Sequence, residues 1–292
     1  MTGLLVAAAL PPVHHAGTGT TTDKGHSGMR FFLHCAALLL IGLQAASAQP
    51  VVIPDVVYPR LPAQAASAAG FAPAGWRVEA EVQGDLNADG IPDIAFTLRA
   101  QDRANVLDHR GLGENPFDSN PRILAAAFGR PGGGYALALA DHGLIPRRTD
   151  PVLTDAFDAE AQSLAIQRGT LRLRLEQFSS AGSWDAGNRT FTFRWQEGRF
   201  ALIGFDRMGV QRNSGQTTRI SVNYLTRRMQ TATGNIETNA ERSRWTTLPP
   251  GAPLSIGEIG DGMDFDPAAA PAPSPAPAPA DQLGNAPASP AK

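Results

Sequence analysis

The feature that most constrains the fold is a strict alternation of apolar and charged residues in segments that short turns join in pairs. Leu171, Leu173 and Leu175 alternate with arginine and glutamate, and the run follows the two-residue turn Arg168-Gly169. A period of two residues is typical of a β-strand with one buried face, and a two-residue turn with glycine is typical of a hairpin. The sequence therefore predicts antiparallel hairpins.

The same alternation recurs along the chain. It predicts strands over residues 76–83, 94–99, 122–128, 135–140, 163–167, 170–178, 190–195, 199–205 and 220–224, with short ones at 229–233 and 244–247. Turns rich in glycine separate most neighbouring runs, as hairpins require. We predict a mainly β fold, an antiparallel meander or sandwich-like sheet.

One turn between two of these strands carries a distinct chemical pattern. The stretch GDLNADGIPD at 84–93 predicts a calcium loop between two strands. Its expected ligands are the side chains of Asp85, Asn87, Asp89 and Asp93 and the backbone carbonyl of Ile91. Calcium prefers six to eight oxygen ligands, and Gly90 at the sixth loop position can take the positive φ that turns the chain around the ion.

The residues after the loop separate it from an EF-hand. An EF-hand has a bidentate glutamate at the twelfth position and a helix after it. Here that position is Phe96, and Ile94, Phe96 and Leu98 alternate as in a strand. The alternative interpretation is an Asp/Asn/Gly turn that holds no metal.

This loop resembles the calcium loops of FG-GAP and VCBS repeats in integrin-type propellers and exported bacterial proteins. A second resemblance, to uncharacterised exported bacterial proteins, rests on the run TFRWQEGRFALIGFD at 192–206 and on NYLT at 223–226. It implies an exported β-domain and no particular activity. A complete propeller is not expected, because a single loop of this kind is present and propellers repeat their blades.

A segment near the N-terminus predicts export. Residues 29–48 have a basic start, an apolar centre and the small-residue pattern Ala46-Ser47-Ala48 of a signal peptide. We interpret residues 1–28 as a gene-model extension, 49–75 as a Pro/Ala-rich linker or arm, 76–263 as the β-domain, and 264–292 as a disordered Pro/Ala-rich tail. The expected location is the periplasm or the exterior.

Composition limits the partners that we expect. The net charge of −2 gives no general attraction for nucleic acid. The single cysteine, Cys35, lies inside the expected signal peptide, so the mature chain would have no disulfide. We expect a monomer with no transmembrane anchor, with Ca²⁺ as its ion and no further cofactor.

The expected function is a binding or structural module whose partner is an unknown envelope component or a glycan. A basic sheet face of Arg172, Arg174, Arg194 and Arg199 would suit anionic polymers. The alternative is a secreted hydrolase with its site in the loops 101–121 and 141–160, which hold His109 and His142. Neither histidine stands in a nucleophile motif, so we assign no catalytic residue.

Overall fold

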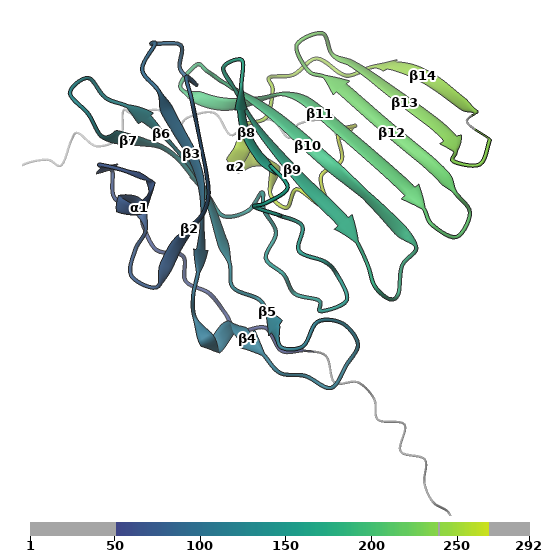
Figure 1. Cartoon of the computed structure of the whole chain (residues 1–292). Coiled ribbons are helices and arrows are strands. Elements are labelled where there is room, and N and C mark those ends of the chain that lie inside the picture. The colour runs from purple at the N-terminus through teal and green to yellow at the C-terminus, as the bar shows by residue number, and fades with distance from the viewer. Residues whose placement is uncertain (1–50, 239, 269–292) are drawn as a thin grey trace, which may run out of the picture. The chain divides into compact units, whose positions relative to one another are not determined.

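The computed structural model describes residues 51–238 and 240–268, which form two large antiparallel sheets and a small one (Figure 1). Antiparallel strands dominate, which confirms the predicted fold class. The five-stranded sheet has the order β1-β7-β6-β3-β2. Its strands are β1 (Gln64–Ala65), β7 (Tyr135–Asp141), β6 (Arg122–Gly129), β3 (Asp93–Ala100) and β2 (Trp76–Gly84).

The seven-stranded sheet is a meander in which each strand pairs with the next one in the chain. Its strands are β8 (Leu164–Gln167), β9 (Thr170–Phe178), β10 (Asp185–Gln196), β11 (Arg199–Gln211), β12 (Gln216–Asn223), β13 (Arg228–Asn235) and β14 (Glu241–Thr247). The turns that join β8 to β9 and β10 to β11 have two residues with positive φ, at 168–169 and at 197–198. Such turns match the twist of the paired strands, and glycine occupies the second position of both.

The main core lies between the two sheets. The predicted alternation places Leu171, Leu173 and Leu175 on the buried face of β9, beside Phe191 and Phe193 of β10. Residues of the five-stranded sheet join the same cluster. The two sheets therefore share one apolar core, as in a sandwich.

The other face of the five-stranded sheet is also covered, by residues of the predicted linker or arm. Leu61, Ala68 and Phe71 are buried against β3, and the Phe71 and Phe96 rings are stacked with centroids 5.4 Å apart. Phe71 ends the short helix α1 (Ala68–Phe71). Residues 58–72 thus pack on the folded unit.

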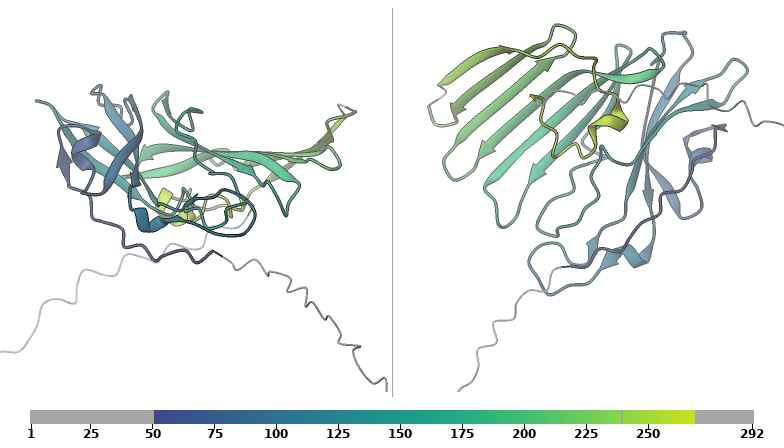
Figure 2. Two further views of the ribbon diagram at one scale, coloured as in Figure 1. Left: turned by 60° about the horizontal axis from the view of Figure 1, so that its bottom comes forward. Right: turned by 180° about the vertical axis from the view of Figure 1, so that it is seen from behind.

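A C-terminal segment lies across the seven-stranded sheet when the molecule is seen from behind (Figure 2, right). It contains α2 (Ile256–Ile259), whose first turn is capped by Ser255 and Glu258. Phe265 packs against Phe191 and Phe205, with centroids 5.5 and 5.1 Å away. The apolar core thus extends two residues past the expected end of the β-domain at 263.

The expected long loop at 101–121 has some regular structure. It holds the 3₁₀ turn η1 (Arg103–Asn105) and a two-stranded sheet of β4 (Val106–Leu107) and β5 (Phe117–Asp118). The expected signal peptide lies outside the described residues.

Candidate functional site

The predicted calcium loop connects β2 to β3 at one edge of the five-stranded sheet. The chain reverses at Ala88 and Gly90, which have φ values of 64° and 79°. Leu86 points into the core and is 3% exposed, whereas Asp89 is exposed. The loop is therefore anchored at one apolar residue and open to solvent at its tip.

The oxygen-bearing side chains of the loop accept hydrogen bonds from its own backbone. Asp85 accepts from the N–H groups of Ala88 (2.7 Å) and Gly90 (3.0 Å). Asp89 accepts from Ile91 N–H (2.7 Å), and the Asn87 amide donates to its other oxygen (2.9 Å). The structure thus brings Asp85, Asn87 and Asp89 to the same turn.

Asp93 has a different position, because it is the first residue of β3 and its side chain is fully buried. One oxygen accepts from the N–H groups of Leu86 (2.7 Å) and Asn87 (3.3 Å), and the other accepts from Gly129 N–H (2.8 Å). Burial raises the pKa of the Asp93 carboxyl, and the three hydrogen bonds, which lower it, do not offset this effect. The charge of the nearby Asp89 raises the pKa further. Asp93 therefore joins the loop to the end of β6.

The glycine at 129 is required by this contact. A Cβ atom there would overlap the carbonyl oxygen of Pro92, so any larger residue would push β6 away from the start of β3. The backbone N–H of Gly129 can then reach the Asp93 carboxylate.

The donor set has the chemistry that a hard cation needs. All five predicted ligands are oxygens, and a carboxylate oxygen that accepts one hydrogen bond keeps a second lone pair. Within residues 51–238 and 240–268, no group of three or more Asp, Glu, His or Cys side chains is placed to hold a metal. The residue types of the loop fit calcium.

The two histidines of the alternative hydrolase site make local contacts. The His109 ring lies 2.7 Å from the carbonyl oxygen of Glu114 through Nε2 and accepts from Gly111 N–H at Nδ1 (3.1 Å). His142 stacks on Tyr58 with centroids 4.3 Å apart. In the described part of the chain no carboxylate is hydrogen-bonded to either ring, so no base and its orienting acid are assembled.

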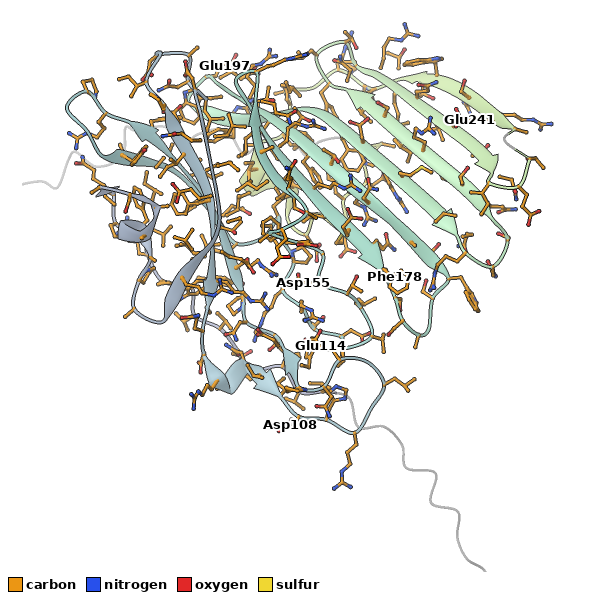
Figure 3. The ribbon with its side chains drawn as sticks, in the orientation of Figure 1. Asp108, Glu114, Asp155, Phe178, Glu197 and Glu241 are labelled. Carbon is orange, nitrogen blue, oxygen red and sulfur yellow. The ribbon has the colours of Figure 1, made fainter. Side chains whose placement is uncertain are left out.

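The two loops of that alternative do meet in space. Arg147 donates to the Ser119 carbonyl (2.7 Å) and the Asn105 amide oxygen (2.9 Å), and Arg148 pairs with Glu114 (2.6 Å). Figure 3 labels Glu114 in this region. Arg147 and Arg148 thus connect the two loops through hydrogen bonds and an ion pair.

A buried ion-pair network was missed from the sequence. Asp155 pairs with Arg122 at 2.7 Å, and Arg122 also pairs with Glu79 at 2.6 Å. The side chains of Arg122 and Glu79 are 2% and 8% exposed. Arg99 joins the network through Glu79 (3.1 Å) and Asp118 (2.9 Å). The network attaches the connection at 142–163, where Figure 3 labels Asp155, to the five-stranded sheet.

The predicted basic face is present for three of its four arginines. Arg172, Arg174 and Arg194 alternate with buried residues of β9 and β10 and so point away from the core. Arg174 is paired with Glu176 (2.6 Å), whereas Arg199 lies near Glu258 (3.8 Å) of α2. Part of the positive charge is therefore neutralised within the chain.

The two tryptophans near that face have different environments. Trp195 packs into the core against Phe128 and Phe200, with centroids 4.9 and 5.1 Å away. Trp184 is 58% exposed. Only Trp184 is thus available to stack on a ligand at the surface.

Comparisons with known proteins add no further assignment, because no protein-family model, curated protein or solved structure matches this chain. Within residues 51–238 and 240–268, no helix has the length and apolar character needed to cross a bilayer.

Proposed function

We propose that this chain is an exported calcium-binding β-domain that serves as a binding or structural module of the cell envelope. The observation that carries the proposal is the turn between β2 and β3, where Asp85, Asn87 and Asp89 stand at alternate positions of one turn whose backbone has positive φ at Ala88 and Gly90. The oxygen types and their spacing are those of an extracellular calcium loop. The resemblance to FG-GAP and VCBS loops supports the same ion.

The place of the loop in the fold suggests what the ion would do. Gly84 at the end of β2 packs against Ile166 of β8, where a Cβ atom would come within 2.5 Å of the isoleucine side chain. Leu86 lies in the core shared by both sheets. An ion bound at 85–93 would therefore stiffen the junction between the two sheets.

Calcium titration of the purified protein tests this proposal. We expect binding with a Kd on the order of 0.1–1 mM, as for other extracellular modules. Asp89→Asn keeps an acceptor for Ile91 N–H and removes one ligand charge, so we expect at least about ten-fold weaker binding without loss of the fold. Isothermal titration calorimetry measures both values.

Asp158→Asn is the matched control. Its carboxylate also caps the backbone of its own turn, at Glu160 and Ala161. The sixth and ninth positions counted from Asp158 are Ser163 and Ile166, where the calcium loop has Gly90 and Asp93. Unchanged calcium affinity is expected for this variant. If the wild-type protein gives no heat at several millimolar calcium, the proposal is wrong.

A further inference from the structure

A cavity of about 280 Å³ lies between the connection at 146–156, the ends of β9 and β10, and the C-terminal segment. Phe178, which Figure 3 labels at the end of β9, is on its wall. Arg148, Ala156, Phe178, Arg189, Asp261 and Met263 are among its lining residues. None of the proposed calcium ligands lines it, so the cavity is separate from the loop at 85–93.

The guanidinium of Arg189, which lines this cavity, has few hydrogen-bond acceptors. It is 7% exposed, and its Nε is buried without a hydrogen-bond partner. Its Nη1 reaches only the Gln177 amide oxygen and the Met263 sulfur, both at 3.2 Å. Among the described residues no carboxylate forms an ion pair with it. A buried guanidinium without an ion-paired carboxylate is unfavourable, so this site favours the binding of an anion.

The surroundings of Arg189 disfavour its positive charge, as its lack of an ion pair also indicates. Burial lowers the pKa of Arg189, and Arg207, its cross-strand neighbour on β11, lowers it further. Asp261 and Asp264 act in the opposite direction without pairing with it. A bound anion would relieve the repulsion between the two arginines.

Arg148 is a second arginine that lines the cavity and has a hydrogen-bond donor without an acceptor. Its side chain is 8% exposed, and Glu114 binds its Nη2 at 2.6 Å. Its Nε, however, is also buried without a hydrogen-bond partner. Arg148 and Arg189 therefore both line this cavity, and each has a buried Nε without an acceptor, which is unusual because buried polar groups are almost always hydrogen-bonded.

The remaining lining selects the kind of anion. Asp150, Asp261 and Asp264 also line the cavity, so a phosphate or another multiply charged anion would be repelled. Met263, Ala156 and Phe178 offer apolar surface to an organic group. We propose that this cavity binds a small organic carboxylate, with the carboxylate on Arg189 and Arg148 and the apolar part against Met263 and Ala156.

Binding measurements on the full chain in EDTA test the proposal apart from calcium binding. The probes are hexanoate, norleucine, hexylamine and 1-hexanol, which share a similar apolar part. We expect hexanoate, norleucine or both to bind at millimolar concentration or below, and hexylamine and hexanol to bind at least about ten-fold more weakly. Norleucine binding more tightly than hexanoate would place the ligand ammonium beside Asp261 or Asp264.

Arg189→Met should weaken carboxylate binding at least about ten-fold, because it removes the charged donor. Without ligand, its unfolding midpoint should not fall, since an unpaired buried charge is removed. Arg189→Lys is the second variant if the methionine protein does not fold, and weaker binding is again expected because lysine lacks the planar set of donors. The proposal is wrong if neither carboxylate binds, if the amine or alcohol binds equally well, or if the arginine variant retains full affinity.

Discussion

Replacing Arg122 with methionine should lower the free energy of unfolding by about 3–5 kcal/mol. The Arg122 guanidinium donates to both oxygens of Glu79 (2.6 and 2.9 Å) and to both oxygens of Asp155 (2.7 and 2.8 Å). Burial lowers the pKa of Arg122, but the hydrogen bonds and charges of these two carboxylates outweigh it and raise the pKa overall. Without Arg122, two largely buried carboxylates would lose their main counter-ion.

Arg174→Ala is the matched control for that substitution. Arg174 also pairs with a carboxylate at 2.6 Å, that of Glu176, but its side chain is 49% exposed. Exposed pairs contribute little because water screens them, so we expect a loss below about 1 kcal/mol. Urea unfolding of both variants measures the difference. Equal effects at the two arginines would contradict the description of a buried network.

Phe191→Ala should destabilise the protein by a similar amount, about 3–5 kcal/mol. Phe191 is fully buried and contacts the rings of Phe205 and Phe265 at 5.1 and 5.5 Å between centroids. The substitution would leave a cavity where the seven-stranded sheet meets the C-terminal segment. A second loss is expected for Phe265→Ala, because that ring packs into the same place.

Phe178→Ala is the control for the core substitution. The Phe178 ring is 40% exposed, and the Arg212 guanidinium lies 4.4 Å from its centroid. Its removal should cost about 1–2 kcal/mol, less than the removal of Phe191, because a large part of the ring already lies in water. Thermal and urea unfolding of the three phenylalanine variants give the comparison. No loss of stability in Phe265→Ala would show that the C-terminal segment does not belong to the folded core.

The hairpins from β8 to β11 were predictable because these strands bury one face. The alternation of Leu171, Leu173 and Leu175 with charged residues reports that asymmetry directly, and the Gly169 and Gly198 turns mark the hairpins. The five-stranded sheet is covered on both sides, and its coverage was not predictable. Phe71 lies in a Pro/Ala-rich segment, and only its distant contact with Phe96 makes it a core residue.

The spacing of oxygens at 85–93 was visible in the sequence, but the direction of each side chain was not. Asp93 turns inward because Gly129, 36 residues away, offers a backbone N–H. Glu79, Arg122 and Asp155 are separated by 43 and 33 residues, so no local pattern joins them. The position of Arg189 was visible in the sequence, because it stands two residues before Phe191 and four before Phe193. In a strand these three residues share one face, so the pattern places a charge on the apolar face of β10.

Thermal unfolding of the protein in excess EDTA, and then in several millimolar calcium, tests the central claim most directly. With a Kd on the order of 0.1–1 mM, calcium should raise the free energy of unfolding by about 1–2 kcal/mol through mass action. We expect the midpoint to rise by several degrees and the rise to be absent in Asp85→Ala. An unchanged midpoint in the wild-type protein would contradict the claim, and residues 85–93 would then be a hydrogen-bonded turn that holds no metal.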